Sequence, residues 1–146
     1  MFIVNVEAAI KHEGKWLIIE RSKNEEHAGG LLSLVGGKVE QGQQHVEILE
    51  SNLKREVLEE VDVEIKNVKY LYSSSFVTDK NEHVLNIVFL CEYQSGIPYP
   101  KSPDEVEDVK WMSSDEIETN SKAPVYLKES IKQADLKIGL IREISL

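Results

Sequence analysis

The residues of this chain whose types and spacing could do chemistry lie in segment 55–60, which reads Arg-Glu-Val-Leu-Glu-Glu. At about 100° per residue on a helix, Glu56, Glu59 and Glu60 fall within about 100° of one another, on the margin of the apolar side. Carboxylates this close repel one another, and near a helix C-terminus each is unfavourable by roughly 0.3–1 kcal/mol. The pattern therefore predicts a positively charged partner against these side chains.

A hard divalent cation is the partner that fits this pattern. Mg²⁺ takes oxygen ligands and typically uses one or two carboxylates together with substrate phosphates. Helix neighbours at i, i+3 and i+4 can converge on one ion or on a pair of ions. Upstream, Gly36 and Gly37 offer backbone that can approach such ions without side-chain bulk. The site would neutralise a diphosphate and activate a water that attacks phosphorus. The alternative is that a Glu-rich helix is merely a solvated face.

The elements that must position these residues follow from the hydrophobic periodicity. Apolar steps of three and four residues predict a helix over 45–61, and alternation at period two predicts strands. The stripe expected to face a core is Val46, Leu49, Leu53, Val57 and Val61. The expected strands are 2–10, 16–20, 65–72, 84–93 and 106–112, together with a short apolar run, 31–35, stopped by Gly36-Gly37.

The C-terminal part carries helix signals and one ambiguous segment. Ser113 and Glu116 have the form of a capping box, which predicts a short helix, and Pro124 opens another helix to about Gln133. Segment 138–146 is apolar enough to be a strand or an interface, which makes a homodimer plausible. The order of elements predicts an α/β fold with a mixed sheet covered by helices.

Length and composition favour one domain, 1–146, with 41% hydrophobic and 29% charged residues. A net charge of -9 disfavours nucleic acid and anionic membrane surfaces as partners. There is no apolar run of transmembrane length and no signal-peptide pattern. The lone Cys91 gives no disulfide framework and is expected to be a buried small hydrophobe. We therefore expect a cytoplasmic protein.

Segment 37–63 resembles the signature of the Nudix hydrolases, G-x5-E-x7-R-E-U-x-E-E-x-G-U, in which U is aliphatic. Glu47, seven intervening residues and then segment 55–60 match its second half. Nine residues separate Gly37 from Glu47 where the signature has five. Aligning Gln43 instead loses the carboxylate, so Glu47 is preferred, since a loop absorbs extra residues more easily than a helix.

A second departure is Asp62, which stands where the signature has its last Gly. That Gly ends the helix in a left-handed conformation, which Asp tolerates better than most residues. We therefore expect a modest stability cost and retention of the metal ligands.

The resemblance implies an α/β/α sandwich with a mixed sheet and hydrolysis of a nucleoside diphosphate linked to another group. It implies that Glu56, Glu59 and Glu60 bind Mg²⁺ or Mn²⁺, with the Gly37 carbonyl as a further ligand. One of Glu59 and Glu60 would be the general base, and Arg55 would orient neighbouring carboxylates or contact phosphate. The partner would be a small nucleotide or another diphosphate.

The resemblance leaves several alternatives open. Asp104, Glu105 and Glu107 lie in a later loop where some Nudix hydrolases place an extra ligand or base, and solvated loop charges are the other interpretation. A catalytically silent nucleotide-binding or regulatory module is the rival function, and a structural cation-binding domain is a third. The signature does not select among nucleoside triphosphates, ADP-ribose, dinucleoside polyphosphates, nucleotide sugars and non-nucleotide diphosphates, because specificity lies outside it.

Overall fold

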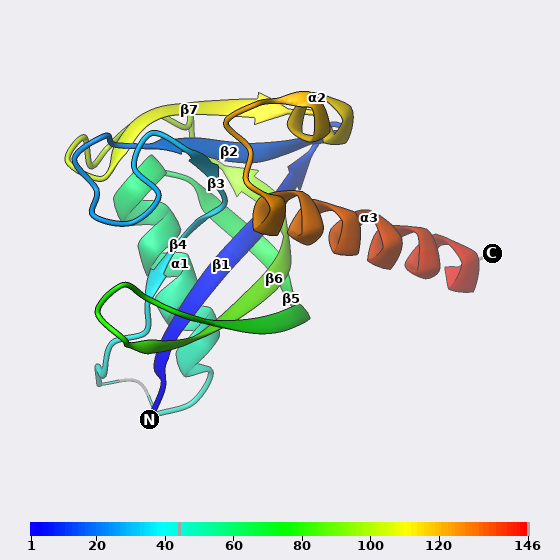
Figure 1. Cartoon of the computed structure of the whole chain (residues 1–146). Coiled ribbons are helices and arrows are strands. Elements are labelled where there is room, and N and C mark those ends of the chain that lie inside the picture. Colours follow the sequence, from blue (N-terminus) through cyan, green and yellow to red (C-terminus); the bar gives the residue numbers. More distant parts are fainter. Residues whose placement is uncertain (44, 146) are drawn as a thin grey trace.

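A computed structural model describes residues 1–43 and 45–145, which form a mixed sheet with helices on both faces (Figure 1). The strands in this part of the chain are β1 (Ile3–His12), β2 (Lys15–Arg21), β3 (Leu32–Ser33), β4 (Val35–Lys38), β5 (Glu64–Val77), β6 (His83–Ser95) and β7 (Val106–Met112). The helices are α1 (Ile48–Val61), α2 (Ser114–Thr119) and α3 (Val125–Ser145). Among these described helices, none has the length and apolar composition needed to cross a membrane.

Strand β1 organises the sheet. Along one edge it pairs in parallel with β6, which in turn pairs antiparallel with β5. Along its other edge β1 pairs antiparallel with β4 over Asn5–Ala8 and then with β2 at Lys11 and His12. Strand β2 continues away to pair with β3 and β7. The sheet therefore forks at β1, and β4 fills the place beside β1 from which β2 diverges.

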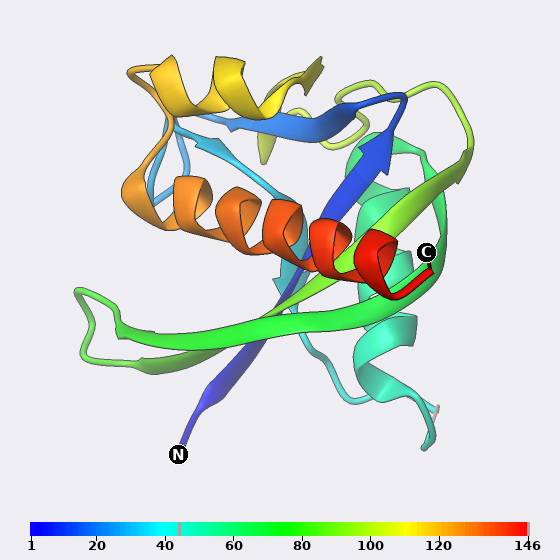
Figure 2. The same cartoon turned by 90° about the vertical axis from the view of Figure 1, so that its right-hand side faces the viewer.

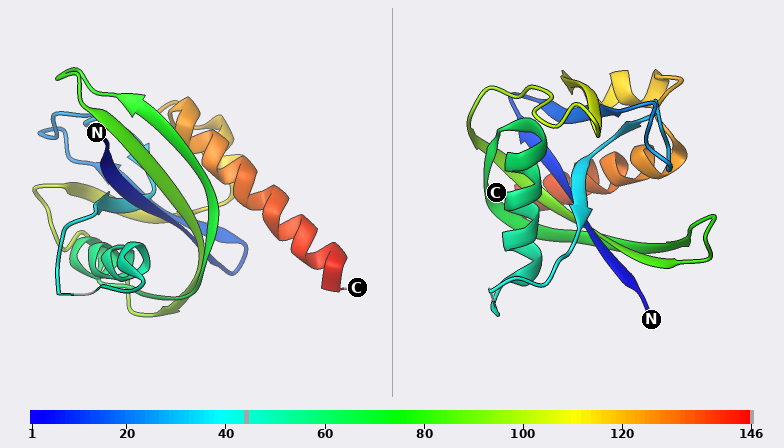
Figure 3. Two further views of the ribbon diagram at one scale, coloured as in Figure 1. Left: turned by 90° about the horizontal axis from the view of Figure 1, so that it is seen from below. Right: turned by 90° about the vertical axis from the view of Figure 1, so that its left-hand side faces the viewer.

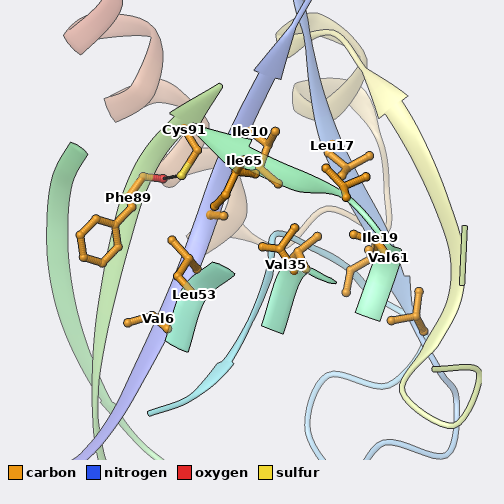
Figure 4. Packing of buried hydrophobic residues seen from close by; sticks show 14 residues of the cluster. Val6, Ile10, Leu17, Ile19, Val35, Leu53, Val61, Ile65, Phe89 and Cys91 are labelled. Carbon is orange, nitrogen blue, oxygen red and sulfur yellow. Dashed lines mark hydrogen bonds between the residues drawn. The ribbon is translucent and has the colours of Figure 1, made fainter. Parts of the chain in front are cut away.

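Two hydrophobic cores separate three layers, with α1 on one face of the sheet and α2 and α3 on the other (Figures 2 and 3). Figure 4 shows residues of the core beneath α1, among them Val6 and Ile10 of β1 and Leu53 and Val61 of α1. Cys91 is buried in this core, as predicted, and its burial raises the pKa of the thiol to about 12. The expected α/β/α sandwich is confirmed.

Helix α1 begins later than the periodicity predicts. Val46 was expected in the core stripe, but it lies before the helix and is 71% exposed. Glu47 occupies the N-cap with φ 55° and makes no side-chain capping hydrogen bond. The helix ends at Asp62 with φ 61°, so the left-handed termination expected at this position is confirmed.

Two further expectations are wrong. Gly36 and Gly37 do not stop a strand but lie within β4, where a Cβ on Gly36 would be 2.0 Å from the Val6 carbonyl oxygen of β1. The last helix does not end near Gln133 but reaches Ser145, so the described part of segment 138–146 is helical and not a strand. Apolar residues on two sides of this helix obscure its period, and Leu146 lies outside the described residues.

Candidate functional site

The acidic end of α1 packs against β4 through Gly37. A Cβ added to Gly37 would lie 2.5 Å from Cδ of Glu56 and 2.6 and 2.8 Å from its two carboxylate oxygens. Any side chain at position 37 would therefore displace the Glu56 carboxylate. The structure thus places the backbone of Gly37 against Glu56, two of the residues that the sequence analysis assigned to one metal site.

The loop that follows β6 is anchored to the last turn of α1. Its backbone and one hydroxyl donate hydrogen bonds to helix carbonyls that have no partner within the helix. The bonds are Tyr99 N–H to Val61 O at 3.2 Å, Lys101 N–H to Glu60 O at 2.9 Å, and Ser102 Oγ–H to Glu59 O at 3.1 Å. This anchoring brings Glu105, three residues further on, to the carboxylate of Glu60.

Glu60 is the most perturbed carboxylate of the site. It is 7% exposed, and in the described part of the chain no group donates a hydrogen bond to its Oε2. Burial, together with the nearby carboxylates of Glu105 and Glu56, raises the pKa of Glu60 to about 9, against a partial lowering by Arg21. An ionised carboxylate buried in this way is strongly unfavourable unless a positive charge joins it.

Arg55 contacts the other two glutamates at the C-terminal end of the helix, Glu56 and Glu59. Its Nη1 lies 3.1 Å from Oε1 of Glu56 and 3.1 Å from Oε2 of Glu59. Burial raises the pKa of the Glu56 carboxyl, and Arg55 offsets part of that rise. Glu59 differs from the others because its side chain is 55% exposed. The structure therefore gives Arg55 the orienting contacts that the resemblance implies.

Asn52 supports Arg55 and was missed in the sequence analysis. Its Oδ1 accepts hydrogen bonds from Nη2 of Arg55 at 2.9 Å and from the backbone N–H of Glu40 at 3.0 Å. The buried amide thus joins the helix to the loop after β4. The available signal was its position three residues before Arg55, on the same side of the helix.

The donor set suits a hard divalent cation, because the carboxylates and the Gly37 carbonyl offer oxygen ligands alone. The unpartnered Oε2 of Glu60 is a buried atom that a cation would satisfy. Within residues 1–43 and 45–145, no three acidic, His or Cys side chains are already gathered as a complete ligand set. Arg55 contacts Glu56 and Glu59 instead, and rotation about their side-chain bonds would bring these carboxylates toward Glu60.

The other acidic candidates lie in different environments. Glu47 is exposed at the opposite end of α1, about 13 Å along the helix axis from Glu56. Asp104, Glu105 and Glu107 are all exposed, and of these three Glu105 lies close enough to Glu60 to raise its pKa. Glu105 is therefore the one of the three loop carboxylates that the structure brings to the predicted site.

A polar group on the sheet face toward α3 was also missed in the sequence analysis. Nδ2 of Asn86 donates to Oε1 of Glu7 at 2.7 Å, and Nδ2 of Asn5 donates to Oδ1 of Asn86 at 2.8 Å. Burial raises the pKa of Glu7, and the bond from Asn86 and the charge of Arg21 oppose the rise. Arg21 also lowers the pKa of Glu60, so it lies near both acidic groups. The available signal was the polar residues Asn5 and Glu7 at odd positions of β1. Helices cover both faces of the sheet, so polar side chains on either face are enclosed.

Comparison with known proteins identifies the family. The family model for the NUDIX domain matches residues 1–133. Over 102 residues the chain is 36% identical to "NAD-capped RNA hydrolase NudC" of Chromobacterium violaceum, covering 70% of this chain and 35% of that protein. The chain thus spans about a third of the length of the curated relatives it matches.

Solved structures agree with this match. The crystal structure of a MutT NUDIX hydrolase from Burkholderia pseudomallei has a TM-score of 0.78 at 25% identity, covering 91% of this chain and 98% of that one. The MutT protein from Methanosarcina mazei Go1 has a TM-score of 0.76 at 25% identity, covering 93% and 94%. This chain therefore belongs to the Nudix hydrolase family, whose members act on phosphorus-containing acid anhydrides.

Proposed function

We propose that this chain is a metal-dependent pyrophosphohydrolase that cleaves the diphosphate linkage of a nucleoside diphosphate-X substrate by attack of an activated water on phosphorus. The observation that carries the proposal is the buried carboxylate of Glu60, with its unpartnered Oε2 and its acidic neighbours Glu56 and Glu105. Mg²⁺ or Mn²⁺ bound there would neutralise the diphosphate and lower the pKa of the attacking water.

The site residues divide by burial and contact. Glu56 and Glu60, with the Gly37 carbonyl, are the groups that would hold the ion, because both carboxylates are packed at the inner side of the helix end. Glu59 has the exposed carboxylate, so we assign it as the general base that accepts a proton from the attacking water. Glu60 is the alternative base. Arg55 keeps the carboxylates of Glu56 and Glu59 oriented and has a cationic group to offer a phosphate.

The substrate class is a diphosphate-containing small molecule. The name of the NudC relatives suggests that a dinucleotide such as NAD belongs in the first assays. Their name also includes capped RNA, whereas a net charge of -9 disfavours contact with an RNA chain. We therefore expect free diphosphate compounds to be cleaved faster than the same linkage at the end of an RNA oligonucleotide.

The test is phosphate or nucleotide release from a panel of compounds, with Mg²⁺ or Mn²⁺, by wild type, Glu59→Gln and Glu60→Gln. The panel contains nucleoside triphosphates, ADP-ribose, NAD, dinucleoside polyphosphates and nucleotide sugars. The same carboxylate-to-amide change at the exposed Glu118 of α2 is the matched control. Turnover that collapses at position 59 or 60 and survives at position 118 supports the hydrolase.

A silent nucleotide-binding module is the competing function. It predicts no turnover of any compound in the panel, together with nucleotide binding in a calorimetric titration of the same preparations. A panel with turnover that persists in both helix variants would instead contradict the assignment of the site residues.

A further inference from the structure

Helix α3 carries apolar residues on two opposite sides. Leu127, Ile131 and Ala134 are buried against the sheet and α2. On the outer side, Leu136 and Leu140 are 56% and 57% exposed. The last turns of α3, drawn in red, project beyond the rest of the chain (Figures 1 and 3). A surface helix with an exposed apolar stripe is typical of a protein interface.

A groove of about 510 Å³ runs between α2 and this part of α3. Ile117 of α2 and Ile131 of α3 contribute apolar walls, and Leu136 and Leu140 lie along the outer margin. The space beside Gly139 is open, since a Cβ there would meet no atom within 4 Å. The groove can therefore accept an apolar side chain from outside.

The charged residues Lys132 and Glu143 of α3 are placed so that two antiparallel copies of the helix can pair them. Lys132, Leu136, Gly139 and Glu143 all line the groove and fall within about 60° on a helix. Lys132 precedes Leu136 by four residues, and Gly139 precedes Glu143 by four. If two copies of α3 pack antiparallel with Leu136 level with Gly139 of the other copy, Lys132 is level with the other copy's Glu143. A two-fold axis repeats both pairings.

We propose that the occupant of this groove is a second copy of the chain, docked through an antiparallel α3–α3 contact with two-fold symmetry. The Leu136 side chain of each copy lies over Gly139 of the other, and each Lys132 forms an ion pair with the opposite Glu143. Such an interface is isologous and closes at two copies. One helix pair gives an interface at the small end of the range, below about 1,200 Å², so the dimer is weak and depends on concentration.

The test is sedimentation velocity over a concentration series from submicromolar to submillimolar. Gly139→Met fills the groove and replaces glycine by a better helix former, so it should weaken dimerisation while leaving the monomer at least as stable. Thermal unfolding of the same variant at low concentration separates this effect from misfolding.

Charge reversal tests the register. Lys132→Glu should weaken dimerisation roughly tenfold, and adding Glu143→Lys in the same chain should restore it. Lys137→Glu makes the same charge change on a side of α3 that does not line the groove, and should leave dimerisation unchanged.

Four results would overturn the proposal. The first two are a wild type that stays monomeric throughout the series and a Gly139→Met variant that dimerises as well as wild type. The third is a double charge reversal that does not restore dimerisation. The fourth is an equal effect of the Lys132 and Lys137 reversals on dimerisation. A monomer throughout the series would also indicate that a different partner, or none, occupies the groove. The proposal does not depend on hydrolytic activity, so these results are independent of the substrate panel.

Discussion

Replacing Glu60 by Gln should stabilise the metal-free protein while abolishing its activity. The carboxylate is buried beside Glu56 and Glu105, and its pKa is raised from 4.5 to about 9. Gln has nearly the same shape but carries no charge at any pH. The substitution therefore removes the cost of ionising a buried group and leaves the packing of α1 nearly unchanged.

The magnitude follows from the pKa and has a definite sign. Because the pKa of Glu60 is higher in the folded state than in the unfolded one, the metal-free wild type loses stability as pH rises from about 4.5 toward 9. Each pH unit in this window costs about 1.4 kcal/mol. Relative to wild type, Glu60→Gln should thus gain about 3 kcal/mol at pH 7 and about 1 kcal/mol at pH 5.

The assay is urea unfolding in a chelator at pH 5, 6, 7 and 8, followed by tryptophan fluorescence. Glu118→Gln serves as the matched control, because the same chemical change at an exposed position of α2 should alter the unfolding free energy by less than about 0.5 kcal/mol. Adding Mg²⁺ should then stabilise the wild type more than Glu60→Gln, since the cation would satisfy a charge that the variant lacks.

Two outcomes would refute this reasoning. A Glu60→Gln variant less stable than wild type in the chelator would mean that its carboxylate already has a compensating partner in the metal-free fold. A stability difference that does not change between pH 5 and pH 8 would mean that ionisation of Glu60 does not contribute to it.

Three other perturbations have expected results. Gly37→Ala should weaken Mg²⁺ activation roughly tenfold in a metal titration of activity, because the added Cβ meets the Glu56 carboxylate, whereas Gly42→Ala, at an open position, should not. Asn52→Ala should lower the unfolding free energy by about 1–3 kcal/mol in urea, since it leaves buried groups unpaired. Asp62→Gly should raise the unfolding free energy by about 1 kcal/mol or less in the same assay, because glycine adopts φ 61° without strain and this gain outweighs the loss of the exposed ion pair with Lys101.

The sequence predicted the parts of the fold that local patterns determine. The stripe Leu53, Val57 and Val61 does face the core, and the Ser113 capping box does begin α2. The start of α1 could not be located in the same way, because Glu47 is a left-handed N-cap without a capping hydrogen bond and no residue signals it. The length of α3 was underestimated, because its second apolar stripe obscures the helical period.

The candidate site was predictable where it depends on one helix and not where it depends on tertiary contacts. Spacing alone grouped Glu56, Glu59 and Glu60 on one side of α1. The approach of Glu105 depends instead on the loop whose backbone binds the last carbonyls of that helix, a contact between segments about forty residues apart. The composition and the hydrophobic periodicity of the sequence therefore could not predict which of the loop carboxylates would reach the site.

This tertiary contact also changes the electrostatic argument. A helix that ends in glutamates is unfavourable because free carbonyls and carboxylates accumulate at one end. The loop after β6 removes the first problem, since its N–H groups and the Ser102 hydroxyl satisfy the carbonyls. It makes the second problem worse, since it adds Glu105 beside Glu60. A chain stabilised only by its own contacts would gain from a neutral residue at either position. Retaining both carboxylates at a site that buries an unpartnered oxygen is therefore better explained by a cation that the folded chain recruits than by the stability of the fold itself.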